Sequence, residues 1–82
     1  MARTVTLYTR EGCHLCDEMK QVISEAGRRV PFDYREVDID GDAALRARYN
    51  TEVPVIAIDD VDAFRYRVKL EALLERLNPG ME

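Results

Sequence analysis

The chain has 82 residues, of which 46% are hydrophobic and 34% are charged, and its formal net charge is −4. This length suits one small domain, because chains of this size bury only about 60% of their unfolded surface. The excess of acidic residues argues against a nucleic-acid partner, since such binding depends on Lys and Arg. No apolar run approaches the roughly 20 residues that span a bilayer, and the N-terminus lacks the apolar core of a secretory signal. We therefore expect a cytoplasmic protein without a membrane partner.

The first half of the chain predicts strand, helix, strand and helix. Residues 3–9 alternate apolar with β-branched or aromatic side chains, a pattern typical of a strand. From Leu15 to Ala26 the apolar positions recur with a helical period, and Gly27 is expected to end this helix. Residues 31–39 are strand-like, and an Asp-rich turn precedes a short helix over residues 43–49.

The second half predicts two strands and a helix. The segment "VPVIAID" is an almost continuous apolar run, typical of a strand buried on both faces, and Pro54 stands at its start, where a missing N–H is tolerated. A further strand is expected over residues 61–66. Leucines at 70, 73, 74 and 77 form one helical face before Asn78. The expected domain covers residues 1–78, followed by a short tail at 79–82.

This order predicts an α/β fold with a four-stranded mixed sheet and three flanking helices. The strand–helix–strand unit implies a right-handed crossover between parallel strands. The short link between the last two strands implies an antiparallel hairpin. The first helix then starts at the carboxyl edge of the sheet, where open α/β proteins usually place ligand chemistry.

The two cysteines, Cys13 and Cys16, both lie in "REGCHLC" at the predicted start of the first helix. Positions i and i+3 share a helix face, so the two Cα atoms can approach within the roughly 4.4–6.8 Å that a disulfide requires. A bridge across so short a loop stabilises a fold little, so its use lies in being made and broken. Zinc needs four ligands, more than two cysteines and His14 supply, and no metal site is expected. An iron–sulfur cluster shared with a second copy and external thiols stays open, as do inert surface thiols.

Position gives the two cysteines different expected roles. Cys13, at or near the N-cap, faces unpaired backbone N–H groups and the positive end of the helix dipole, which favour a thiolate. We expect Cys13 to be the nucleophile and Cys16, one turn inside the helix, to be the resolving thiol. His14 is the only histidine. It either adds a positive charge beside Cys13 or is an exposed side chain without a role.

The segments "LYTREGCHLC" and "TEVPVIAID", in this element order, resemble the glutaredoxins and similar small members of the thioredoxin-fold superfamily. The resemblance spans nearly the whole chain and implies a thioredoxin-like fold. It also implies that the Val53–Pro54 bond is cis and that Val53 offers backbone groups to an extended thiol peptide. Arg10 stands where glutaredoxins often have a lysine that faces the glutathione carboxylate. The resemblance thus makes Arg10, His14, Leu15, Val53 and Pro54 the expected substrate-binding residues.

Two stretches depart from the glutaredoxin pattern. His14 and Leu15 stand where a proline and an aromatic residue are usual. Asp62 and Ala63 stand where the family usually has a glycine pair, and Arg65 lies near the position of an expected acidic residue. We interpret Arg65 as an edge-strand charge that discourages strand pairing.

The sequence therefore predicts a thiol–disulfide oxidoreductase in which Cys13 attacks a disulfide of a protein or small molecule and Cys16 releases the product. We expect a monomer with no bound cofactor. Glutathione, another low-molecular-weight thiol or a thioredoxin-type reductase would supply electrons. Two alternatives stay open: a dimeric iron–sulfur cluster carrier that uses Cys13 and external thiols, and a non-catalytic thioredoxin-fold interaction module.

Overall fold

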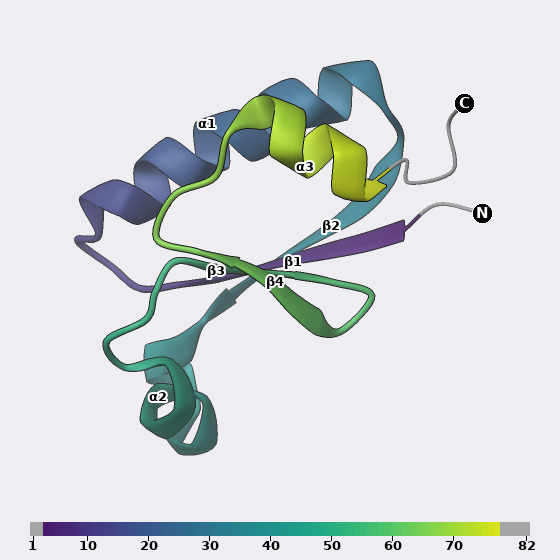
Figure 1. Cartoon of the computed structure of the whole chain (residues 1–82). Helices are drawn as coiled ribbons and strands as arrows, with labels where there is room; N and C mark the ends of the chain where they lie inside the picture. Colours follow the sequence, from purple (N-terminus) through teal and green to yellow (C-terminus); the bar gives the residue numbers. More distant parts are fainter. Residues whose placement is uncertain (1–2, 78–82) are drawn as a thin grey trace.

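The computed structural model describes residues 3–77, whose elements follow the predicted order (Figure 1). In chain order these are β1 (Arg3–Thr9), α1 (His14–Arg29), β2 (Phe32–Asp38), the 3-10 turn η1 (Ile39–Gly41), α2 (Ala43–Tyr49), β3 (Val55–Ile58), β4 (Val61–Arg65) and α3 (Leu70–Leu77). The predicted boundary between a domain of residues 1–78 and a tail at 79–82 lies outside the described residues. Within residues 3–77, no helix has both the length and the apolar character needed to cross a membrane.

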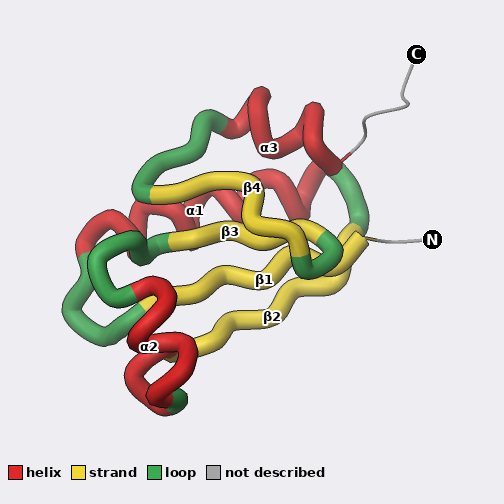
Figure 2. Tube along the Cα trace, turned by 60° about the horizontal axis from the view of Figure 1, so that its bottom comes forward, coloured by secondary structure: helices red, strands yellow, loops and turns green. Residues whose placement is uncertain are grey.

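The four strands form one mixed sheet with the order β2-β1-β3-β4 (Figure 2). β1 and β2 run parallel, while β3 is antiparallel to both β1 and β4. Helix α1 provides the crossover between the parallel strands, and a tight turn at Asp59 and Asp60 joins β3 to β4. The predicted α/β fold, with a mixed four-stranded sheet and three helices, is confirmed.

Helices cover both faces of this sheet: α1 and α3 lie on one face and α2 lies on the other (Figure 1). A larger core lies beneath α1 and α3, and a smaller core lies beneath α2. The buried residues of the larger core are Val5, Leu7, Met19, Ile23, Ala26, Ile56, Ile58, Leu73 and Leu77, and those of the smaller core are Ile39, Tyr49 and Val55. The central strands β1 and β3 therefore contribute to the buried centre of the molecule, and the loops that follow β1 and precede β3 are fixed to it.

Helix α1 is longer than predicted. Gly27 does not end the helix, which continues to Arg29. The helix stops before Pro31 because the residue that precedes a proline is restricted to extended backbone, and Val30 has φ −138° and ψ 145°. Gly27 lies inside the helix beside the ring of Phe32, which a Cβ at this position would meet at ordinary van der Waals distance.

Candidate active site

The loop between β1 and α1 places Cys13 at the N-cap of α1. Gly12 has a φ of 78°, a conformation that glycine adopts without a steric penalty, and it turns the chain out of β1. Cys13 is extended, with φ −96° and ψ 109°, and its Sγ accepts a hydrogen bond of 3.1 Å from the backbone N–H of Cys16. The sulfur thus caps a helix terminus, the position expected from the sequence.

Cys13 and Cys16 form a disulfide, with their Cα atoms 5.2 Å apart. The two ends of this bridge differ in exposure, since Cys16 is 1% exposed whereas Cys13 is only half-buried. A reactant can therefore approach Cys13, while Cys16 is covered by the core. Of the two residues between the cysteines, His14 is exposed and Leu15 is half-buried.

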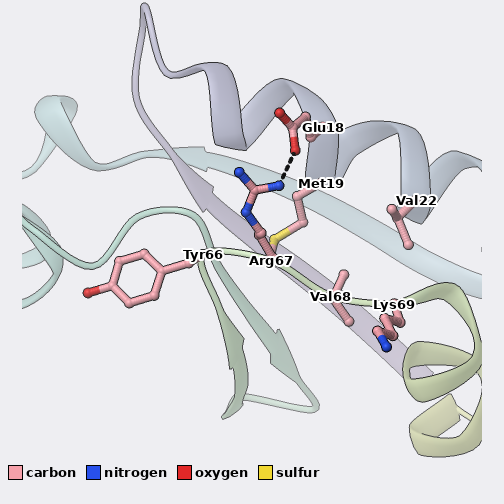
Figure 3. A pocket seen from close by; sticks show the side chains of 7 residues that line it. All are labelled: Glu18, Met19, Val22, Tyr66, Arg67, Val68 and Lys69. Atoms are coloured by element: carbon pink, nitrogen blue, oxygen red, sulfur yellow. Dashed lines mark hydrogen bonds and ion pairs between the residues drawn. The ribbon is translucent and has the colours of Figure 1, made fainter.

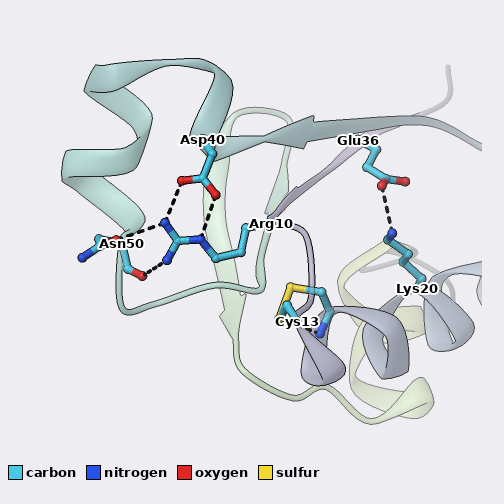
Figure 4. The surroundings of a disulfide bond; sticks show 7 residues. Arg10, Cys13, Lys20, Glu36, Asp40 and Asn50 are labelled. Atoms are coloured by element: carbon cyan, nitrogen blue, oxygen red, sulfur yellow. Dashed lines mark hydrogen bonds and ion pairs between the residues drawn. A yellow bond between two sulfur atoms is a disulfide. The ribbon is translucent and has the colours of Figure 1, made fainter.

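Arg10 follows β1, and its guanidinium points away from the disulfide (Figure 4). Its Nη2 and Nε donate to the carboxylate of Asp40 at 2.7 and 3.1 Å, and its Nη1 donates to the backbone oxygen of Asn50 at 2.9 Å. The Arg10 hydrogen bond is the main reason why the pKa of the Asp40 carboxyl lies below its ordinary value. Arg10 thus links the cysteine loop to η1 and to the residue that follows α2.

The Val53–Pro54 bond is cis, which confirms the prediction, and Pro54 is buried. We call residues 50–54 the Pro54 loop. Its residues are tied to three other parts of the molecule: Asn50 accepts from Arg10, Thr51 accepts from the Tyr66 hydroxyl, Glu52 accepts from Arg65, and Pro54 accepts from the Tyr66 N–H. These contacts hold the loop to Arg10 on one side and to Arg65 and Tyr66 on the other.

The cysteine loop, the Pro54 loop and the β4–α3 connection at residues 66–69 lie at the same end of the molecule (Figures 1 and 2). The fold therefore brings Cys13, Cys16, His14, Leu15, Val53 and Pro54 to one end, as the resemblance implies. Arg10 lies at this end too, but its guanidinium is engaged by residues of the chain itself.

Sequence reasoning missed the roles of three residues at this end. Asp40 was expected only as a turn former, Asn50 drew no expectation, and Tyr66 was expected as the last residue of a strand. β4 ends at Arg65 instead, and Tyr66 has a φ of 67°. The pairing of Arg10 with Asp40 crosses 30 residues of sequence, so no local pattern could have indicated it.

Asp62 and Ala63 lie inside β4. They fall within the strand predicted over residues 61–66 and follow the third strand, β3. The connection between β4 and α3 begins at Tyr66. Within residues 3–77, no three or more His, Cys, Asp or Glu side chains are grouped so that they could hold a metal ion.

A protein-family model described as "Glutaredoxin-like domain (DUF836)" matches residues 4–78. The chain belongs to this family. The glutaredoxin-like chain is 30% identical to the "Uncharacterized protein Rv0508" of Mycobacterium tuberculosis over 80% of each chain.

Solved structures agree with the family assignment. Protein Ne2328 from Nitrosomonas europaea superposes with a TM-score of 0.82 at 30% identity, covering 94% of this chain and 93% of that one. A thioredoxin from Halobacterium salinarum superposes with a TM-score of 0.72 at 16% identity, covering 98% of this chain and 75% of that one. At this lower identity the likeness shows the fold alone, and the fold is that of thioredoxin.

Proposed function

We propose that this glutaredoxin-like protein is a thiol–disulfide oxidoreductase that uses the Cys13–Cys16 pair. The observation that carries the proposal is the placement of the disulfide, which joins the half-buried N-cap of α1 to a buried residue one turn inside the helix. A bridge across so short a loop constrains the unfolded chain little. Its position at a helix N-terminus suits a sulfur that carries negative charge when reduced.

The reaction begins with the reduced pair. The Cys13 thiolate attacks one sulfur of a substrate disulfide, a mixed disulfide forms, and the other substrate sulfur leaves as a thiolate. Cys16 then loses its proton and attacks the Cys13 sulfur, which releases the second substrate sulfur and closes the Cys13–Cys16 disulfide. Counted from the dithiol, whose Cys13 proton is released when the thiolate forms, the cysteine pair loses two electrons and two protons, and the substrate gains two electrons and two protons as its sulfurs become thiols. Two external thiols, or a thioredoxin-type reductase, restore the dithiol.

The surroundings of Cys13 support its role as the nucleophile. The backbone N–H of Cys16 donates to the Cys13 sulfur in the oxidised protein, and the same donor would stabilise a thiolate after reduction. Exposed His14, the next residue, adds a nearby positive charge when it is protonated.

The substrate would lie across the Pro54 loop and the start of α1. In the proposal Val53 offers backbone groups to an extended substrate, and half-buried Leu15 forms apolar surface beside the sulfurs, while buried Pro54 sets the course of the loop that presents Val53. Arg10 could reach a substrate carboxylate only by releasing Asp40, to which it is bound by two hydrogen bonds. We therefore assign Arg10 as a positioning residue that holds the Pro54 loop.

In this proposal the protein acts as a monomer in the cytoplasm, and its substrates are disulfides of proteins or small molecules. It requires no bound cofactor and no nucleic-acid or membrane partner. Glutathione, another small thiol or a thioredoxin-type reductase is its electron source.

The test is to reduce the oxidised protein in two systems, glutathione with its reductase and thioredoxin with its reductase, and to count thiols by trapping. A Cys16→Ser variant should accumulate a mixed disulfide on Cys13, whereas a Cys13→Ser variant should not. Reduction in either system, together with this trapped intermediate, would support the proposal and identify the reductant. Failure of Cys13 and Cys16 to cycle would overturn it, and visible absorbance of the freshly purified protein would favour an iron–sulfur carrier.

A further inference from the structure

Most of the charged side chains around the cysteine loop are bound to side chains of opposite charge. Arg67 of the β4–α3 connection donates to Glu18 of α1 at 3.0 Å (Figure 3). Arg65, the last residue of β4, donates to Glu52 of the Pro54 loop at 2.8 Å. Arg10 is likewise held by a carboxylate. Because each of these guanidinium groups lies against a negative charge, they offer little net attraction to an anion that approaches the disulfide.

Two acidic residues beside Cys13 have no such partner. Glu11 lies in the loop just before Cys13, and Asp17 lies in the first turn of α1, where its backbone N–H donates to the oxygen of Cys13 at 3.2 Å. Both side chains are exposed. In the described part of the chain, residues 3–77, neither carboxylate forms an ion pair. Unpaired negative charges therefore lie on both sides of Cys13 in the chain.

Other positive charges at this end lie farther along α1, face another group or depend on pH. Lys69 lies with Val22 in a groove between α1 and the β4–α3 connection (Figure 3), about 13 Å along the helix from its N-cap. Arg46 of α2 lies near enough to Asp40 to act on its carboxyl group. Exposed His14 is positive only when it is protonated. The unpaired carboxylates are therefore the lasting charges that adjoin the cysteine pair.

We propose that Glu11 and Asp17 are specificity-determining residues that favour disulfides with positive charge close to their sulfur atoms. This inference rests on the proposed function and names its substrate class as cationic disulfides. An exposed carboxylate attracts an approaching cation and repels an anion, and both effects weaken with distance and with salt. A cationic disulfide is thus concentrated near Cys13, whereas an anionic one meets two like charges and no unpaired arginine among those described above.

The experiment measures the second-order rate constant at which a small disulfide oxidises the reduced Cys13–Cys16 pair, by trapping the remaining thiols. Cystamine is the cationic disulfide, dithiodipropionate the anionic one and bis(2-hydroxyethyl) disulfide the neutral one. The ionic strength is about 0.01 M, where the Debye length is about 30 Å. The pH is about 8, at the upper limit of the range in which the charge of a histidine usually changes.

Glu11→Gln and Asp17→Asn each remove one negative charge and keep the size of the side chain. Each should lower the ratio of the cystamine rate constant to the dithiodipropionate rate constant about threefold, and the double variant should lower it about tenfold. In about 1 M salt, where the Debye length is about 3 Å, the ratios of all these proteins should agree within about 1.5-fold. The neutral disulfide reports any general change in the reactivity of Cys13, which leaves the ratio unchanged.

Asp33→Asn is the matched control, because it removes the same charge from an exposed carboxylate at the opposite end of the sheet. Asp33 is paired with Thr4 of β1, about 15 Å of strand from the start of the cysteine loop. Its ratio should stay within about 1.5-fold of the wild-type ratio. Circular dichroism checks the fold of each variant.

The inference would be overturned if the double variant kept the wild-type ratio, or if Asp33→Asn lowered the ratio as much as Glu11→Gln and Asp17→Asn do. Either result leaves the oxidoreductase proposal standing as long as the neutral disulfide oxidises the wild-type dithiol. A wild-type dithiol that none of the three disulfides oxidises would overturn both proposals.

Discussion

At the scale of single residues, Arg10 and Asp40 tie the cysteine loop to the Pro54 loop. Arg10 belongs to the chain that leads from β1 to Gly12, and its guanidinium meets the Asp40 carboxylate through two hydrogen bonds. This paired geometry is the one that arginine forms best with a carboxylate. The same side chain holds Asn50, so one residue connects two segments of the candidate site.

We predict that Asp40→Asn accelerates hydrogen exchange of the Glu52 amide, which donates to Tyr49 at 2.9 Å near the start of the Pro54 loop. The cause is the loss of the charged partner that keeps Arg10 against this loop. The pKa of Asp40 is lowered, so in the wild type the contact is complete above the ordinary aspartate pKa of 3.8 and is lost as the pH falls through the lowered value. NMR-detected exchange measures the effect. Asp33→Asn, on exposed β2, is the control, and equal protection in all three proteins would contradict the prediction.

The residues of the site differ in how far the sequence could predict them. The placement of Cys13 and Cys16 follows from local order, because Gly12 and the apolar period that starts at Leu15 mark where the helix begins. The engagement of Arg10 does not, because its partners lie 30 and 40 residues away. Charge spacing along the chain carries no information on such a contact until the topology is known.

At the scale of elements, α2 depends on its last residue. The helix spans seven residues, too few to be stable in isolation. Tyr49 is buried, its ring stacks on Tyr8 of β1 with 4.6 Å between ring centroids, and its hydroxyl donates to Asp62 of β4 at 3.0 Å. One side chain therefore fastens α2 to two strands. Burial, followed by the hydrogen bond to Asp62, raises the pKa of Tyr49 to about 12.

We predict that in Tyr49→Phe the free energy of unfolding falls less steeply with rising pH in the alkaline range than in the wild type. In the wild type the unfolded chain releases the Tyr49 proton at the ordinary pKa of 10.0, whereas the folded protein holds it up to a pKa of about 12. The stabilisation is therefore fully present below pH 10.0 and is lost as the pH rises through about 12. Urea unfolding over this pH range measures the slope. The pKa of Tyr34 is also raised, but Tyr34 is present in both proteins and contributes equally to both. The prediction would be contradicted if the free energy of unfolding changed with pH in the same way in the wild type and in Tyr49→Phe.

The ends of the elements show where sequence patterns stop being sufficient. Gly27 is a helix-ending residue by its intrinsic preference, yet Phe32 packs against it and Pro31 sets the actual limit of α1. Tyr66 has a strong strand preference, yet its hydrogen bonds to Thr51 and Pro54 accompany a left-handed backbone. At Gly27 a nearby proline prevails over the intrinsic preference of glycine, and at Tyr66 contacts with a distant segment prevail over the strand preference.

At the scale of the whole molecule, α3 completes the larger core. Leu73 is 0% exposed in this core, whereas Leu74 on the next position is only half-buried. A domain this small buries a limited share of its surface, so each core side chain contributes a large part of a net stability of about 5–15 kcal/mol.

We predict that Leu73→Ala lowers the free energy of unfolding by about 2–5 kcal/mol, because it removes buried methyl groups and leaves a cavity. Urea denaturation of the oxidised protein measures this change. Leu74→Ala deletes the same atoms at a more exposed site and should cost less. A larger loss in Leu74→Ala than in Leu73→Ala would show that α3 packs through its other face.

The arrangement of elements was predictable at this scale because it depends on few rules. Hydrophobic period distinguishes the strands from the helices, and the handedness of crossovers together with the length of the links sets the strand directions. What could not be predicted was the set of side chains that meet between distant segments, such as Tyr49 with Asp62 or Tyr66 with Thr51. Those contacts depend on the register of strand pairing and on backbone angles, and the spacing of hydrophobic residues in the sequence determines neither.

Arg3 donates to the backbone oxygen of Leu77 at 3.2 Å, so the two ends of the described domain are adjacent. Both lie at the end of the molecule opposite the cysteine loop (Figures 1 and 2). A protein immobilised on an electrode through either of these ends would present its disulfide outward in every molecule of the film. Voltammetry on such an oriented layer would then read the midpoint potential of the cysteine pair under defined geometry.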